Sequence, residues 1–144
     1  MIYLAQTDTT VGFLSKNLKE LNIAKGRKLD QDCLITISKF YLLKDFVRVP
    51  VNFRNFVRRA KKTTIIYPNL KSFRVVKDCE HAKFLDKNGW FYSTSANKHG
   101  LKFDFKFAKK VANKIVFNDD GSKFVEGEAS RIYRISKIKK RRLR

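Results

Sequence analysis

Short apolar stretches alternate with polar ones along the chain, and their spacing predicts a mixture of strands and helices. Apolar and β-branched runs predict strands at residues 2–5, 33–38, 63–67, 73–76, 90–94, 114–117 and 131–135. A period of 3.6 residues predicts helical segments at 14–25, 40–47, 53–60, 78–88 and from about 104. The pattern is therefore that of an α/β protein of the α+β type.

Particular residues set the ends of these elements. Gln6 to Gly12 is expected to be a threonine-rich loop, with a helix through Leu14, Leu18 and Leu21 after it. Asp78 is expected to cap a helix that stops at Asn88-Gly89. Phe103, Phe105 and Phe107 alternate with charged residues and would also fit a strand, but the spacing of Phe107, Ala108 and Val111 favours a helix beginning near Asp104.

Composition indicates a globular body with a strongly basic surface. The 144 residues fit one domain, expected over residues 1–136 with a basic tail at 137–144, and 43% of them are apolar. The formal net charge of +20 favours a polyanionic partner, with nucleic acid ahead of an anionic membrane surface. No apolar run approaches the ~20 residues of a membrane span, and the N-terminus does not resemble a signal peptide. We expect a cytoplasmic protein in which Cys33 and Cys79 are reduced thiols.

The basic residues form two clusters that are candidates for RNA contact. A charge run is often only a solvated surface, but these runs are uncompensated, which favours binding to RNA phosphates. No aromatic motif typical of single-strand recognition is present, and the phenylalanines are expected in the core, so recognition should be by shape and charge. The candidate residues are Arg54, Arg58, Arg59, Lys61, Lys62, Lys139, Lys140, Arg141, Arg142 and Arg144.

Common catalytic and metal motifs do not occur in the sequence. His81 and His99 lack partners at metal-ligand spacing, so no protein metal site with histidine or cysteine ligands is expected, and no P-loop, G-x-G-x-x-G or G-x-S-x-G is found. Three polar clusters remain: TDTT at 7–10, KGR at 25–27 and STSAN at 93–97. Each one alone is compatible with a capped turn, a helix end or a strand exit.

The three clusters in this order resemble the YrdC-like family, the threonylcarbamoyl-AMP synthases. QTDTTVG is similar to the family's first motif, KGRKLDQ to its lysine-arginine motif, and STSANKHG to its Ser-Thr-Ser-Ala-Asn loop. Thr64 in AKKTT, Arg74 in FRVV and Ser130 in ASRIYRI match further family positions, so the resemblance covers about residues 2–135. It implies a twisted mixed β-sheet with flanking helices and a concave basic surface.

The resemblance also implies a reaction and roles for particular residues. In the implied reaction, threonine, bicarbonate and ATP give threonylcarbamoyl-AMP and pyrophosphate for tRNA modification. ATP would arrive as its Mg²⁺ complex, and no tightly bound cofactor is expected. Lys25 and Arg27 would contact the triphosphate, Thr7 and Thr9 would face threonine or its carbamate, and Arg74 would pair with a carboxylate or phosphate. The nucleotide would be held by Ser93, Ser95, Asn97, Thr64 and Ser130, with Mg²⁺ near Asn97.

A second function of another class stays open. Gln31 stands where the family has a second lysine, and Ala60-Lys61-Lys62 stands in place of a Pro-Gly-Pro turn. Losing one preorganised donor costs on the order of a hundredfold in rate. These two differences favour a non-catalytic RNA-binding module of the same fold. The expected partners in both cases are tRNA or double-stranded RNA, with other tRNA-modification proteins as further candidates.

Overall fold

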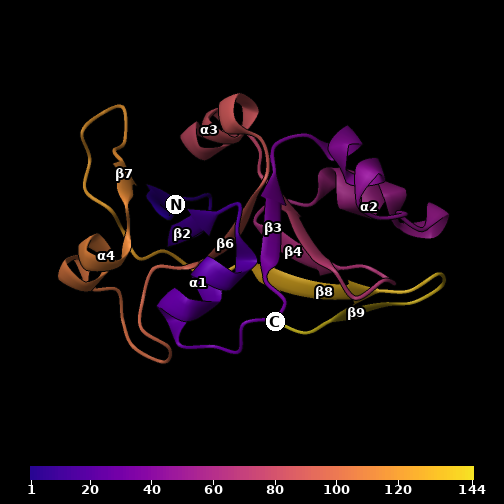
Figure 1. Cartoon of the computed structure of the whole chain (residues 1–144). Coiled ribbons are helices and arrows are strands. Elements are labelled where there is room, and N and C mark those ends of the chain that lie inside the picture. Colours follow the sequence, from indigo (N-terminus) through magenta and orange to yellow (C-terminus); the bar gives the residue numbers. More distant parts are fainter. The chain divides into compact units, whose positions relative to one another are not determined.

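The computed structural model describes residues 1–144, which form two compact units. Unit 1 contains residues 1–33 and 91–129, and unit 2 contains residues 34–90 and 130–144. Each unit has a mixed β-sheet with flanking helices (Figure 1). The predicted α/β class is thus confirmed. No helix is long and apolar enough to cross a membrane.

The sheet of unit 1 has the strand order β7-β1-β2-β6. Its strands are β1 (Tyr3–Gln6), β2 (Val11–Ser15), β6 (Phe91–Ser95) and β7 (Lys114–Val116). β2 runs antiparallel to both β1 and β6, whereas β7 runs parallel to β1. Two helices, α1 (Leu18–Lys25) and α4 (Phe105–Val111), complete the unit.

Helices α1 and α4 pack on one apolar face of this sheet. Leu4 of β1 lies opposite Phe13 of β2 in the strand register, and neither side chain is exposed to solvent. Leu21 of α1 and Ala108 of α4 join the same buried cluster. The ring of Phe13 meets that of Phe107 edge to face, with centroids 6.3 Å apart. This packing fixes the end of α1, where the basic KGR cluster begins.

The strand β2 differs from the prediction, which placed a loop to Gly12 and a helix from Leu14. All five residues of β2 are buried, so the strand lacks the polar alternation by which a half-buried strand is recognised. Leu14 lies in this strand. The helix begins only at Leu18, because the Asn17 side chain accepts hydrogen bonds from the backbone N–H groups of Lys19 and Glu20.

The sheet of unit 2 has the strand order β3-β5-β4-β8-β9. β3 is parallel to β5 and β4 to β8, while the pairs β4-β5 and β8-β9 are antiparallel. The strands are β3 (Leu34–Ile37), β4 (Thr63–Ile66), β5 (Ser72–Val75), β8 (Arg131–Ile135) and β9 (Lys140–Arg142). The helices are α2 (Arg54–Arg59), α3 (Glu80–Asn88) and the 3₁₀ helices η1 (Phe40–Asp45) and η2 (Val51–Phe53).

Two helices of unit 2 differ in part from the prediction. Where a helix was predicted at 40–47, the chain forms the 3₁₀ helix η1 over Phe40–Asp45, and no α-helix. The prediction that Asp78 caps α3 is wrong, because Asp78 has a left-handed φ of 53° and Cys79 occupies the cap position. The predicted stop at Asn88-Gly89 is confirmed, since α3 ends at Asn88 with Gly89 at its C-cap.

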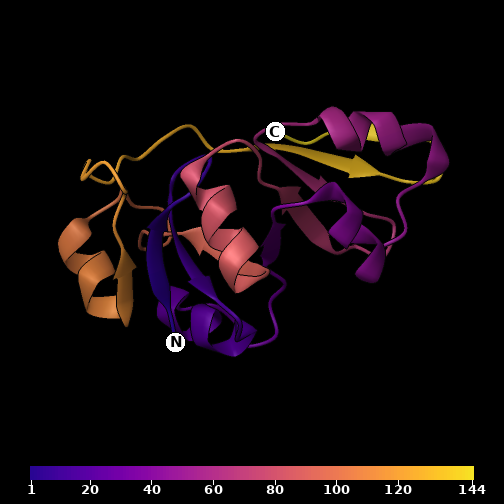
Figure 2. The ribbon, with the colours of Figure 1, turned by 90° about the horizontal axis from the view of Figure 1, so that it is seen from above.

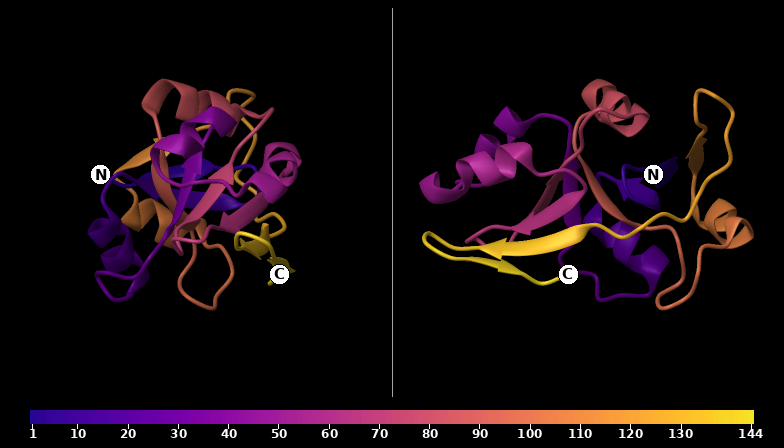
Figure 3. Two further views of the ribbon diagram at one scale, coloured as in Figure 1. Left: turned by 90° about the vertical axis from the view of Figure 1, so that its right-hand side faces the viewer. Right: turned by 180° about the vertical axis from the view of Figure 1, so that it is seen from behind.

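Residues 137–144 contribute a strand to unit 2. β9 pairs with β8, and the two strands form the hairpin that Figure 1 and Figure 3 show in yellow. The hairpin closes where the Ser136 backbone N–H donates to the Lys139 carbonyl at 2.8 Å. The expected boundary between a domain at 1–136 and a tail at 137–144 remains a prediction.

Candidate functional site

The TDTT cluster forms the tight turn that joins β1 to β2. The Thr7 hydroxyl donates to the Thr10 carbonyl at 2.5 Å, and it accepts from the backbone N–H groups of Thr9 and Thr10 at 3.3 and 3.2 Å. Thr7 is therefore occupied in closing the turn. The Thr9 hydroxyl, 3.3 Å from that of Thr7, is half-buried and is the more accessible of the two predicted substrate contacts.

Two glycines bring other segments of unit 1 against this turn. A Cβ on Gly12 would lie 3.1 Å from the Thr94 carbonyl and 3.2 Å from the Thr7 methyl group. A Cβ on Gly127 would collide with the Thr9 carbonyl. The strap, which we define as residues 124–128, is also joined to β1 by two hydrogen bonds between the Gln6 amide and the backbone of Val125.

Lys25 is the last residue of α1, and its side chain is turned into the unit. Gly26 follows in the left-handed conformation, with φ 66°. Its backbone N–H donates to a carbonyl of the last helical turn, and the backbone N–H of Arg27 donates to the Asn22 carbonyl at 2.8 Å. This C-cap ends the helix between the two cations of the KGR cluster. Lys25 is only 9% exposed, whereas Arg27 is half-buried.

The STSAN loop closes around the Lys25 ammonium. Lys25 Nζ donates to the Ser95 carbonyl at 2.9 Å, to the Asn97 carbonyl at 2.5 Å and to Asn97 Oδ1 at 3.0 Å. An ammonium has three donors, so all of them are engaged by the loop. Asn97 Nδ2 in turn donates to the Leu101 carbonyl. The KGR and STSAN clusters thus meet in unit 1.

Charge and burial together change the titration of Lys25. Burial, followed by the positive charge of Arg27, lowers the pKa of Lys25 to about 8, and Cys33 acts in the opposite direction. The lysine therefore loses its proton near neutral pH more readily than an exposed lysine. A ligand that brings negative charge would favour the protonated form.

Arg27 lies next to Cys33 and the buried Ser93. Its Nη2 is 3.9 Å from Cys33 Sγ, which donates to the Ser93 carbonyl at 3.0 Å. Its Nε is buried and has no hydrogen-bond partner. Gln31 contributes only its backbone, whose carbonyl accepts from Asn22 Nδ2 at 2.9 Å, and its side chain is exposed.

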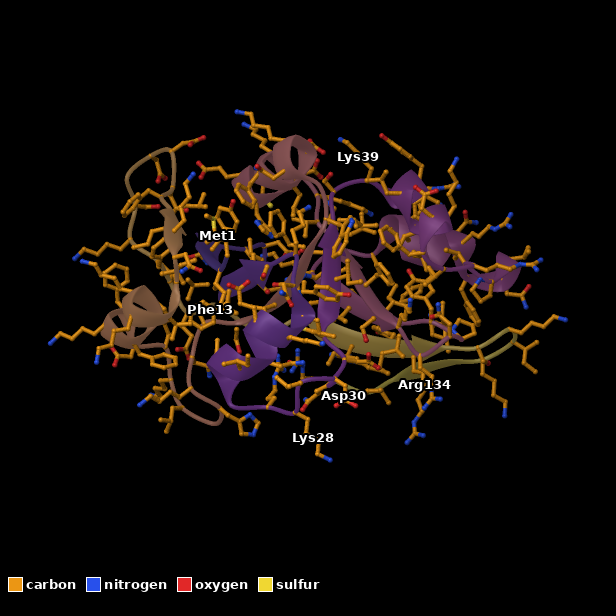
Figure 4. All side chains as sticks on the ribbon, viewed as in Figure 1. Met1, Phe13, Lys28, Asp30, Lys39 and Arg134 are labelled. Atoms are coloured by element: carbon orange, nitrogen blue, oxygen red, sulfur yellow. The ribbon has the colours of Figure 1, made fainter.

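The loop after α1 is the outer part of this region. Lys28 and Asp30 lie on it, and Figure 4 shows the Lys28 side chain extending away from the ribbon.

Ser95 is exposed and Ser93 is buried, so the predicted nucleotide contacts of STSAN differ in accessibility. We define the unit 1 site as Thr9, Lys25, Arg27, Ser95 and Asn97.

Thr64 and Ser130, also predicted to hold the nucleotide, form a buried pair in unit 2. Their hydroxyl oxygens are 2.8 Å apart. Arg144 donates to the Ser130 carbonyl at 2.8 Å and to the Ser130 hydroxyl at 3.3 Å. Arg144, expected to contact RNA, thus places a guanidinium group beside this hydroxyl pair, which the sequence pattern did not indicate.

Arg74, predicted to bind substrate, lies buried on β5. Its charge acts on His81 of α3. Burial is the larger cause and the positive charge of Arg74 the smaller cause that together lower the pKa of His81 to about 4. Neither ring nitrogen of His81 has a hydrogen-bond partner, and the ring stacks on Phe84 with centroids 6.2 Å apart. His81 is therefore a neutral core residue at physiological pH.

The predicted RNA-contact residues all lie in unit 2. Those of the first cluster, 54–62, lie on α2 and the turn after it, and those of the second lie on the β8-β9 hairpin and at Arg144. Lys140 Nζ lies 4.2 Å from the centroid of the Phe56 ring, so the hairpin reaches α2 although the two are far apart in sequence. Figure 4 shows that Arg134, on β8, also extends outward.

The fold is the YrdC-like fold, which several solved structures share. P. abyssi Sua5, as a doubly substituted variant, aligns with a TM-score of 0.80 and 18% identity over 99% of this chain and 49% of Sua5. The same protein complexed with L-threonine gives 0.75 and 17% over the same shares. This chain spans about half the length of Sua5.

Two further solved structures share the fold. MTH1692 from Methanobacterium thermoautotrophicum aligns with a TM-score of 0.64 and 19% identity over 92% of this chain and 74% of MTH1692. Full-length HypF, in its phosphate- and nucleotide-bound form, gives 0.70 and 13% over 99% of this chain and 26% of HypF. No protein-family model and no curated protein matches the chain. The YrdC-like fold expected from the sequence is confirmed.

Proposed function

We propose that this protein is an L-threonylcarbamoyladenylate synthase that uses threonine, bicarbonate and ATP in the modification of tRNA. One observation carries the proposal: the buried Lys25 ammonium, with Arg27 beside it, is enclosed by the STSAN loop. The proposal is supported by the YrdC-like fold, which is shared by a protein complexed with L-threonine and by another in a phosphate- and nucleotide-bound form.

The reaction needs cations and donors more than it needs an acid-base pair. A carbamate oxygen attacks the α-phosphorus of ATP, the new P–O bond forms, and the bond to pyrophosphate breaks with its electron pair staying on the leaving oxygen. Both reactants are anions, so the protein has to hold them in line and offset their charge. The unit 1 site offers Lys25, Arg27 and hydroxyl groups for this task.

The contacts of each residue suggest a division of roles. Lys25 orders the STSAN loop with its three hydrogen bonds, and its charge acts on the phosphates from within the loop. Arg27 has no hydrogen-bond partner at Nε and makes only a long contact to sulfur at Nη2, so its guanidinium is the better direct phosphate ligand. The exposed Ser95 hydroxyl is a second direct ligand.

The remaining groups of the site would contact threonine and Mg²⁺. The Thr9 hydroxyl is available to the threonine carbamate, whereas the Thr7 hydroxyl keeps the turn closed. Mg²⁺ arrives with ATP as part of the substrate. Asn97 Oδ1 accepts from Lys25 and retains a second lone pair that would serve a water of the hydrated metal.

The test is threonine- and bicarbonate-dependent release of pyrophosphate from ATP by the purified chain. We expect release that requires both substrates and that falls by about a hundredfold or more in Arg27→Ala. Arg48→Ala, which removes an exposed arginine of unit 2, is the matched control and should keep full activity. Absence of release by the unaltered protein would reject the synthase.

A second candidate function is RNA binding without synthesis. The exposed side chain of Gln31, which leaves no second lysine at the site, favours it, as do the basic residues of α2 and of the β8-β9 hairpin. A gel-shift titration with duplex RNA separates the two candidates. Binding that weakens steeply with salt, in a protein that releases no pyrophosphate, would leave the binding module as the function. The cytoplasmic location remains a prediction under both functions.

A further inference from the structure

Unit 2 contains a cavity of about 510 Å³ beside α2 and β8, the helix and strand that Figure 2 shows next to each other in purple and yellow. Three cations line it, Arg59, Lys61 and Arg131, together with the rings of Phe56 and Tyr133. No carboxylate lines it. The unit 1 site uses none of these residues. The cavity thus combines positive charge with aromatic surface.

The two rings are held in place by their neighbours. Phe56 and Tyr133 meet edge to face, with centroids 5.0 Å apart and an interplanar angle of 69°. Lys140 Nζ lies over the Phe56 ring at 4.2 Å and is not part of the cavity wall. Lys140 Nζ also lies 5.9 Å from the centroid of the Tyr133 ring, and both rings are half-buried and line the cavity, so each keeps part of its surface open to a ligand. A fixed ring with an accessible surface suits the stacking of a base.

The turn between α2 and β4 holds one cation in position. Thr63 Oγ1 and Arg131 Nη2 both donate to the Lys61 carbonyl, at 2.7 and 3.1 Å. This bond uses one of the five guanidinium donors of Arg131, and the others remain for a ligand. Lys62 adopts a left-handed φ of 50° in the same turn. Ala60-Lys61-Lys62, unexplained by the unit 1 site, is therefore the segment that positions Arg131.

The remaining cations are open to a ligand. Arg59 and Lys61 are exposed, and the only acidic partner at the rim is Asp78, 3.7 Å from Lys61 Nζ. Both members of that pair are largely exposed, at 69% and 81%, so the pair is weak and easily replaced by a phosphate. Lys77 donates to the carbonyls of Arg58 and Ala60 and so holds the C-terminal end of α2.

We propose that this cavity binds one unpaired nucleotide of an RNA strand, with the base against Tyr133 and Phe56 and its phosphates on Arg59, Lys61 and Arg131. The volume lies within the roughly 300–1,000 Å³ of small-ligand sites. The inference deepens the RNA partner of the proposed function and rests on it. It adds base stacking to the recognition by shape and charge that the sequence suggested, because bases within a duplex keep their faces stacked on one another.

The experiment compares a fluorescein-labelled single-stranded oligouridine with an RNA duplex of the same length, by fluorescence anisotropy without ATP or threonine. We expect Tyr133→Leu to weaken single-strand binding by about fivefold to a hundredfold and to leave duplex binding within twofold. Arg59→Gln should weaken both RNAs. Lys106→Gln, which removes one exposed charge on α4 in unit 1, is the matched charge control and should change neither by more than twofold.

Three results would overturn the inference: an unchanged single-strand affinity in Tyr133→Leu, equal losses for single strand and duplex, or equal effects of Arg59→Gln and Lys106→Gln. A further measurement uses the unaltered protein, so the test does not depend on whether a variant folds. Photocrosslinking of 5-iodouridine-substituted single strand should label Phe56 or Tyr133, and labelling only elsewhere would reject the site. Pyrophosphate release is assayed separately, so failure of the synthase and failure of this site are told apart.

Discussion

Lys25 Nζ lies 3.0 Å from Asn97 Oδ1, although 72 positions separate these residues in the chain. The same ammonium holds the carbonyls of Ser95 and Asn97. The lysine of one motif and the loop of another therefore form one hydrogen-bonded group in unit 1. This relationship indicates that Lys25 orders the loop as well as supplying charge.

Replacement of Lys25 by methionine, which keeps the side-chain length, should loosen the STSAN loop. Three hydrogen bonds are lost, so we expect faster amide exchange at Leu101, whose N–H donates to the Lys98 carbonyl within this loop. Hydrogen exchange followed by mass spectrometry measures the change. Lys28→Met in the exposed loop is the control. Unaltered exchange at residues 95–101 would contradict the ordering role.

The affinity for ATP should fall as pH rises above about 8. Burial, with the added charge of Arg27, lowers the pKa of Lys25 to about 8, so the free site loses a positive charge there, whereas bound phosphate favours the protonated form. We expect a loss of up to about tenfold per pH unit above this pKa. Titration calorimetry between pH 7 and 9.5 measures it. In Lys25→Arg, which stays charged, the decline should be absent; a decline of equal slope would assign it to another group.

Gly127→Ala should separate the strap from the TDTT turn. The added Cβ has no space beside the Thr9 carbonyl, and that carbonyl belongs to a turn fixed by the Thr7 hydroxyl. We expect tryptic cleavage after Lys123 to accelerate several-fold. Glu128→Ala, an exposed change one residue further, should leave the rate as it is. Equal cleavage rates in the two variants would show that the strap has room to shift.

Ser130→Ala should lower the free energy of unfolding by about 1–3 kcal/mol. The variant removes the bond to Thr64 in a buried place and one of the bonds from Arg144. Urea denaturation gives the value. Ser136→Ala, at an exposed hydroxyl of the hairpin, should cost less than about 1 kcal/mol. Similar losses in both variants would argue against a special contribution of the buried pair.

Stability should fall between pH 6.5 and pH 4 because of His81. In the folded chain burial, together with Arg74, lowers the pKa of His81 to about 4, so the unfolded chain takes up a proton that the folded chain does not. The loss amounts to about 2–3 kcal/mol at pH 4.5. Urea unfolding at pH 7 and 4.5 should show it, His81→Leu should reduce it, and the exposed His99→Leu should not. A loss that persists in His81→Leu would place the cause elsewhere.

Much of the fold followed from local sequence, and the exceptions have physical causes. β3, β4, β5, β6 and β8 lie where apolar and β-branched runs predicted them, because such side chains pack well on a pleated surface. β2 was missed since burial on both faces removes alternation. β9 was missed since Lys140 and Arg141 have no strand preference, and only pairing with β8 orders them.

Only part of the predicted site lies together in unit 1, because Thr64, Ser130 and Arg74 belong to unit 2. The family resemblance assigned Lys25 and Asn97 to one site, and in the structure their side chains are joined by a hydrogen bond. Spacing could not show that the Thr7 hydroxyl is occupied by its own turn, nor that Arg144 reaches Ser130. Gly127 lies in a stretch without periodicity, and only the three-dimensional approach to Thr9 explains it.

The hairpin strand β9 lies at the edge of its sheet, where copies of the protein could associate. β9 pairs with β8 alone, so its outer edge carries backbone groups that another strand could use. That edge consists of Lys140, Arg141 and Arg142. Mutual repulsion between two such edges opposes sheet extension from one molecule to the next. The positive charges on this edge therefore oppose aggregation, and this effect weakens wherever they are neutralised.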